Sequence, residues 1–161
     1  MSFSKSRAWD PLLILSQIVC LQCADYVLQS AVLYLVESAQ SRVLTLHQLF
    51  SPYALHYASS SGLYVTAVTL LNAVLVAFAF EFIVERSRLC LDFAVTLRCV
   101  HVAACIVYTE TFPTWWYFWL VQCVCALVTA CAAHHRCRQR ELIDIPRRQV
   151  VRRTAAAAVT V

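Results

Sequence analysis

The sequence predicts an all-α, polytopic membrane protein built as a bundle of four transmembrane helices. Composition is the first reason, because 61% of the 161 residues are hydrophobic and only 14% are charged. Block length is the second, because about 20 apolar residues in a helix cross a hydrocarbon layer of about 30 Å. The sequence therefore predicts four spans, at residues 11–36, 62–84, 91–108 and 112–133.

The first span opens at Trp-Asp-Pro. Asp10 can cap the exposed amides of the first turn, where the missing N–H of Pro11 is harmless. Trp9 is then placed at the headgroup level. Two basic residues before the apolar run resemble the start of a signal peptide, but the run far exceeds the usual ~7 to 15 residues and no clear cleavage site follows. We therefore expect a retained span.

The first span also carries polar side chains. Gln22, Asp25 and Gln29 are three and four residues apart, so they share one face of the helix. A carboxylate inside a span costs on the order of 2.5 to 3.5 kcal/mol on insertion scales and rarely faces lipid. This face is therefore expected to pack against other helices.

The remaining spans differ in their polar content. The second has Asn72 as the strong polar group of its middle, and the third carries Arg98 and His101. The fourth opens with Pro113 and an aromatic cluster that is typical of a membrane interface. Only a few residues join the third and fourth spans, so these helices are expected to be antiparallel neighbours.

The basic residues predict the topology. Lys and Arg number two before the first span, one after it, two in the next loop, none in the last loop and seven after the fourth span. The positive-inside rule therefore places both termini and the loop with Arg86 and Arg88 in the cytoplasm. An even number of spans also requires both termini on one side.

Two segments lie outside the spans: a loop within the expected membrane domain of residues 1–141, and the tail that follows this domain. Residues 37–61 form the non-cytoplasmic loop, where a short amphipathic helix at the interface is predicted, with Pro52 as its breaker. An irregular loop packed on the bundle is the alternative. Residues 142–161 are basic and end in a low-complexity run, which predicts a disordered cytoplasmic tail.

An intramembrane polar cluster of Gln22, Asp25, Arg98 and His101 is predicted. The depths of Asp25 and Arg98 differ by roughly 5 to 8 Å, which a long arginine side chain can bridge. Such a pair can hold helices in register or serve a proton or ion pathway. The first role is favoured, because no chain of ionisable groups leads in or out.

The nine cysteines do not favour redox chemistry. Cys20 and Cys23 form a C-x-x-C pattern inside the first helix, but neither non-cytoplasmic loop contains a cysteine. A zinc site at Cys131, His134, His135 and Cys137 is not favoured, because adjacent histidines cannot both point one way. No metal or cofactor is expected. Cys137, just after the fourth span, is a candidate for S-palmitoylation.

The arginine-rich C-terminal segment is explained by topology and lipid. Each basic residue near an anionic leaflet contributes about 1 kcal/mol, so a bilayer with an anionic cytoplasmic leaflet is the expected partner and nucleic acid is not. A single glycine excludes a phosphate-cradling loop, and no hydrolytic constellation is present. An enzyme is therefore not expected, while a homo-oligomer is left open.

Residues 9–19 read Trp-Asp-Pro-Leu-Leu-Ile-Leu-Ser-Gln-Ile-Val. This run resembles the N-terminal signature of the Sys-one family of Golgi integral membrane proteins. Further pieces follow in the family's order: Cys90-Leu91-Asp92-Phe93, Val95-Thr96, His101, Phe112-Pro113, Trp119-Leu120-Val121-Gln122, Val124-Cys125, Glu141-Leu142 and Ile145-Pro146. Together these pieces cover most of the chain.

The resemblance implies a four-span, non-catalytic receptor of the Golgi and trans-Golgi network membrane. Its partner would be an Arf-like small GTPase with an acetylated N-terminus, and recruitment would support golgin tethering and endosome-to-Golgi vesicle traffic. Topology places the expected partner-binding surface on the cytoplasmic face, at Trp9, Asp10, Pro11, Arg86, Arg88, Glu141, Leu142, Ile145 and Pro146. The alternative function is a small transporter or proton-coupled carrier that uses Asp25, Arg98 and His101.

Overall fold

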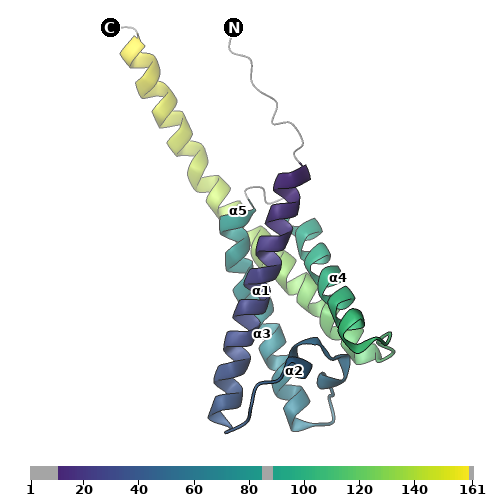
Figure 1. Ribbon diagram of the computed structural model, residues 1–161. Coiled ribbons are helices and arrows are strands. Elements are labelled where there is room, and N and C mark those ends of the chain that lie inside the picture. The colour runs from purple at the N-terminus through teal and green to yellow at the C-terminus, as the bar shows by residue number, and fades with distance from the viewer. Residues whose placement is uncertain (1–10, 85–88, 160–161) are drawn as a thin grey trace.

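The computed structural model describes residues 11–84 and 89–159, which form a bundle of helices (Figure 1). The elements are α1 (Pro11–Ala39), α2 (Leu46–Phe50), the 3-10 helix η1 (Pro52–Ala54), α3 (Ser60–Ile83), α4 (Cys90–Thr109) and α5 (Trp116–Val159). Within these ranges there is no strand, and four helices are long and apolar enough to cross a membrane. The predicted all-α class with four candidate spans is confirmed.

Successive long helices run in opposite directions (Figure 1). The start of α1, the end of α3 and the start of α4 lie at one end of the bundle, which we call the terminal end; α5 continues beyond it. The short elements α2 and η1 and the turn from α4 to α5 lie at the opposite end, the loop end. The connections therefore alternate between the two ends, as four antiparallel spans require.

Helix α1 lies at the edge of the bundle and is the least buried of the four long helices. It contacts α3 and α4 through one stripe of buried residues spaced by three or four. The stripe is Leu21, Gln22, Asp25, Gln29, Leu33 and Glu37. The predicted polar face therefore packs against other helices, and the apolar remainder of α1 faces outward, as suits contact with lipid.

The core has two apolar clusters with polar side chains between them. The cluster nearer the terminal end includes Leu21, Phe80 and Leu97. The cluster nearer the loop end includes Leu33 and Phe118. Because buried polar groups inside a membrane protein must find partners within the protein, this intermediate layer is where interhelical hydrogen bonds are expected.

The loop after α1 combines the two alternatives that the sequence leaves open. The short helix α2 forms and ends at Phe50, with Ser51 as its C-cap immediately before Pro52. Its last residue packs on the bundle, since the ring of Phe50 lies 5.3 Å from that of Tyr26 and 5.8 Å from that of Tyr108. The loop therefore contains a short helix and is also packed against the bundle.

Two boundaries differ from the sequence-based expectation. The fourth long helix begins at Trp116, whereas the sequence predicts its start at residue 112; the chain from Phe112 to Trp115 is not helical. The same helix then continues to Val159, whereas disorder is predicted from residue 142. Alanine and arginine are strong helix formers, and extending an existing helix avoids the cost of nucleation, which accounts for this continuation.

Candidate functional site

An ion pair at the centre of the bundle joins α1 to α4. Arg98 Nη2 lies 3.3 Å from Asp25 Oδ1, and the side chains are 4% and 0% exposed. The structure thus brings together the two residues that the sequence predicts as a pair. In the bilayer interior each charge would be costly alone, so pairing is the physical condition for burying either one.

Asn72 on α3 completes this cluster. Its Nδ2 donates to Asp25 Oδ1 at 2.7 Å and to the backbone oxygen of the same residue at 3.3 Å. Sequence reasoning noted Asn72 as the polar group of its span but did not assign it a partner. The triad of Asp25, Asn72 and Arg98 therefore links three helices, and its chemistry is suited to holding them in register.

His101 does not join the triad, contrary to the predicted cluster. Its Nε2 lies 3.6 Å from Cys105 Sγ, and its ring lies 5.9 Å from the Tyr26 ring and 6.3 Å from the Phe50 ring. Within residues 11–84 and 89–159, no hydrogen bond or ion pair connects it to Asp25. Three residues along α4 change the depth by about 4.5 Å, so His101 lies nearer the loop end than Arg98 does.

Gln22 is buried on the same stripe of α1, but it also stands apart from the triad. Neither its Nε2 nor its Oε1 has a hydrogen-bond partner in the described part of the chain. The four residues predicted as one polar cluster are thus divided into a bonded pair and two separate groups.

The terminal end of α3 is held by side chains from both neighbouring helices. The last carbonyls of any helix lack partners within it and must be satisfied from outside. Gln17 Nε2 on α1 donates to Ile83 O at 2.9 Å, and Arg140 Nη1 on α5 donates to Glu81 O. We call this arrangement, together with Arg136, the terminal junction.

Arg136 fastens α5 to α3 within the terminal junction. Its Nε and Nη2 both lie 2.8 Å from Glu81 Oε2, and its guanidinium carbon lies 4.0 Å from the centre of the Phe78 ring. Such partly exposed pairs contribute about 0 to 1 kcal/mol to stability. The larger consequence is geometric, because these contacts set the direction in which α5 leaves the bundle.

The predicted partner-binding residues fall into three groups. Trp9, Asp10, Arg86 and Arg88 lie outside the described residues. Pro11 and Leu142 are exposed. Glu141, Ile145 and Pro146 belong to α5, with side chains outside the description.

The neighbours of these residues in the chain nevertheless share one end of the bundle. Helix α1 begins at this end with Pro11, and Val84 and Leu89 flank the loop between α3 and α4 there (Figure 1). Leu142 on α5 comes two residues after Arg140, which bonds α3 at the terminal junction. The described flanks of all three predicted pieces therefore lie at the terminal end.

Cys137 is not placed for S-palmitoylation, which corrects the sequence-based candidate. The residue is only 3% exposed, and its Sγ lies 3.7 Å from Val84 O and 3.9 Å from Phe80 O. An acyltransferase needs an accessible thiol, and this one faces α3 because its position on α5 points into the helix interface.

The remaining sequence patterns are the C-x-x-C pair in the first span and the histidine–cysteine group near the end of the fourth. Cys20 and Cys23 are exposed on the outer face of α1. No group of three or more histidine, cysteine, aspartate or glutamate side chains is arranged to hold a metal ion within the part of the chain that the structure describes.

Comparison with known proteins gives one consistent result. Residues 4–147 match the SYS1 (Sys-one) family, described as "Integral membrane protein S linking to the trans Golgi network". A protein named SYS1 homolog from Dictyostelium discoideum is 35% identical over 89% of this chain, and one from Nematostella vectensis is 33% identical over 86%. Protein SYS1 of Saccharomyces cerevisiae is 29% identical over 87%.

The lengths of these relatives differ. The matched part covers 62% of the Dictyostelium protein, 87% of the Nematostella protein and 69% of the yeast protein. No solved structure matches the chain.

Proposed function

Because this chain belongs to the SYS1 family of integral membrane proteins, we propose that it is a Golgi membrane receptor for an Arf-like small GTPase. It recruits the GTPase through its cytoplasmic face, and the recruited GTPase supports golgin tethering and endosome-to-Golgi vesicle traffic. The role is one of binding and not of catalysis. The family's description as linked to the trans-Golgi network supports the location.

The observation that carries this proposal is the meeting of three segments at the terminal end. The first turn of α1, the flanks of the loop between α3 and α4, and the continuation of α5 all lie there (Figure 1). The distribution of basic residues supports a cytoplasmic position for this end. A cytosolic GTPase reaches only this end of the protein, and it meets all three segments together.

Lipid contributes to the same face. Arg136, Arg138 and Arg140 follow the apolar part of α5, where the anionic cytoplasmic leaflet would lie. Each basic residue close to such a leaflet contributes about 1 kcal/mol, so this group anchors the end of the span. After Arg140 the helix has 19 further residues (140 to 159), or about 28 Å at the helical rise, which are available to a protein partner.

Depletion of the protein in its own cells is expected to release the Arf-like GTPase from the Golgi into the cytosol. Imaging the GTPase beside an independent Golgi marker measures this directly, because the marker shows that the organelle persists. Re-expression of the full chain should restore the Golgi signal. A GTPase that stays on the Golgi after depletion contradicts the receptor function.

Glu81→Arg is expected to weaken recruitment while leaving the spans in the membrane. The change places a third cation beside Arg136 and Arg140 and turns an attraction into a repulsion, so α5 leaves the bundle in a different direction. If the loss of this ion pair lowers the binding free energy by about 1 kcal/mol, the amount of bound GTPase at limiting concentration falls about fivefold. Binding of the purified GTPase to proteoliposomes measures the loss.

The matched control is the charge exchange Glu81→Arg with Arg136→Glu, which restores the attraction. Recovery of binding in this double variant is the expected result. Equal binding by the wild type and Glu81→Arg would show that the terminal junction does not orient the docking surface.

The alternative function, a small transporter or proton-coupled carrier, has less support from the geometry. Asp25 contacts both Arg98 and Asn72, and His101 has no hydrogen bond to either charged residue within the described ranges. This arrangement suits a structural link better than a relay, because Arg98 and Asn72 both hold Asp25 Oδ1 and His101 is not bonded to that pair in the part of the chain that the structure describes.

A further inference from the structure

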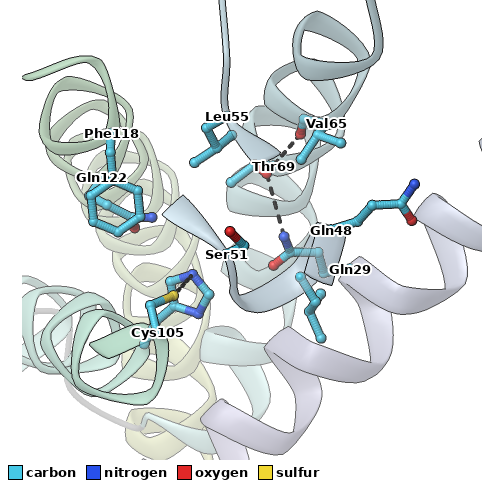
Figure 2. A pocket seen from close by; sticks show the side chains of 11 residues that line it. Gln29, Gln48, Ser51, Leu55, Val65, Thr69, Cys105, Phe118 and Gln122 are labelled. Atoms are coloured by element: carbon cyan, nitrogen blue, oxygen red, sulfur yellow. Dashed lines mark hydrogen bonds between the residues drawn. The ribbon is translucent and has the colours of Figure 1, made fainter. Parts of the chain in front are cut away.

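A small cavity lies between the helices and the loop near the loop end of the bundle (Figure 2). The space open to the centre of a water molecule is about 10 Å³, close to the minimum that one water requires. All four long helices and the loop after α1 supply its walls. The lining residues on which the argument depends are Gln29, Ser51, Thr69, His101, Cys105 and Gln122.

Three of these side chains carry polar atoms without a partner in the described ranges. They are Gln29 Oε1, His101 Nδ1 and both polar atoms of the Gln122 amide. The residues are 2%, 3% and 4% exposed, so bulk water does not reach them. They come from α1, α4 and α5, respectively.

Existing hydrogen bonds leave the unpartnered atoms available to the cavity. Gln29 Nε2 donates to Thr69 Oγ1 at 3.4 Å, and that hydroxyl donates to Val65 O at 2.8 Å, which leaves Gln29 Oε1 unused (Figure 2). His101 Nε2 lies 3.6 Å from Cys105 Sγ, which leaves Nδ1 unused. Neither Nε2 nor Oε1 of Gln122 has a hydrogen-bond partner in the described ranges, so both atoms are unused.

The energetics favour occupation of this space. An unsatisfied buried polar atom costs about 1 to 3 kcal/mol, and the surrounding bilayer offers no substitute partner. A buried water typically makes about three hydrogen bonds, whereas a cavity lined only by apolar groups stays dry. Here three helices each supply at least one unused donor or acceptor around a space of one water.

We propose that this cavity is a binding site for one ordered water molecule that bridges Gln29, His101 and Gln122. The water completes hydrogen bonds that no pair of these side chains makes directly, and it joins α1, α4 and α5 near the loop end. The loop residues Leu49 and Ser51 also line the cavity, so the loop forms the wall on that side.

Radiolytic footprinting of the full chain in lipid nanodiscs tests the site. X-ray radiolysis of a bound water generates a hydroxyl radical in place, which oxidises adjacent side chains that mass spectrometry then identifies. Cys105, which lines the cavity, is expected to be modified roughly tenfold faster than Cys125, which is also fully buried but is not part of the lining. Equal slow modification of the two cysteines would mean that the cavity is dry.

The variant Gln29→Leu with Gln122→Leu removes two of the three expected partners of the water. Oxidation of Cys105 should fall to the level of Cys125, while circular dichroism confirms that the helices persist. Thr129→Val is the matched control, because its hydroxyl is buried on α5 and bonds Ala73 O outside the cavity. Unchanged oxidation of Cys105 in the folded leucine variant would overturn the proposed bridge.

A thiol reagent added without irradiation separates a closed site from an open one. With a closed cavity, Cys105 should not react with a small water-soluble methanethiosulfonate. Reaction at a rate similar to that of an exposed thiol would show that bulk solvent enters, which also contradicts a single enclosed water. The test is independent of GTPase recruitment, so it can fail while the proposed function holds.

Discussion

Arg98→Met is expected to destabilise the folded bundle by about 3 to 5 kcal/mol, because it leaves the buried carboxylate of Asp25 without its countercharge. Methionine retains much of the length and apolar volume of the arginine stem, so the loss reports mainly on charge. Asn72 still donates to Asp25 Oδ1 but cannot neutralise it. Titration with SDS in mixed micelles, followed by circular dichroism, measures the free energy of unfolding.

The matched control is Asp25→Asn with Arg98→Gln, which removes both charges and keeps polar side chains in both places. Its free energy of unfolding should lie closer to the wild type than that of Arg98→Met, because no uncompensated charge is then buried. A wild-type value for Arg98→Met would mean that the pair does not stabilise the bundle.

The same double variant separates the two candidate functions. A receptor whose triad only holds helices in register should still recruit the GTPase when the neutral pair folds. A carrier that moves protons or ions through Asp25 and Arg98 should lose its flux. Normal folding together with lost recruitment would show that the charges contribute to docking, which the present geometry does not predict.

Gly62→Ala is expected to disrupt the junction between the loop and α3, with a cost of about 1 to 3 kcal/mol or more. Gly62 is the only glycine in the chain. A Cβ atom there would lie 2.1 Å from His56 O, 2.7 Å from His56 N and 2.8 Å from His56 C. All three are backbone atoms, so no side-chain rotation relieves the clash and the segment around His56 must move.

The displacement should be visible at the loop end. The His56 ring lies 5.1 Å from the Trp115 ring, so movement of the loop is expected to change tryptophan fluorescence and to lower the unfolding temperature in detergent. Ser60→Ala is the matched control in the same first turn of α3, where the exposed position should cost no more than about 0.5 kcal/mol. Equal unfolding temperatures for wild type and Gly62→Ala would contradict the close approach of the backbone.

The approach of Asp25 and Arg98 could be predicted because depth along a helix follows from counting residues at a constant rise. Rotation about the helix axis could not be predicted in the same way. The sequence places Asn72 in the middle of the second span. Its role as the third member of the triad with Asp25 and Arg98 depends on the rotation of α3, which turns this side chain toward α1. His101 and Gln22 were assigned to the cluster by depth and spacing, and packing directs them elsewhere.

The same distinction explains the other corrections. Cys137 follows the apolar part of its span, where a thiol can be accessible. Its side chain lies on the side of α5 that faces α3, however, and is therefore buried. The Glu81–Arg136 pair joins residues 55 positions apart, and no local spacing predicts it. The cavity at the loop end arises from five elements together, so no single segment carries its signal.

By itself, the sequence determined the all-α class, the four candidate spans, their approximate limits and the family. These features follow from hydrophobic length and from residue order, which are properties of the linear chain. The tertiary structure alone decided which buried polar side chains meet, how α2 packs on the bundle and how the terminal junction holds α5 to α3. Those outcomes depend on the rotation and crossing of the helices, which packing between distant segments sets.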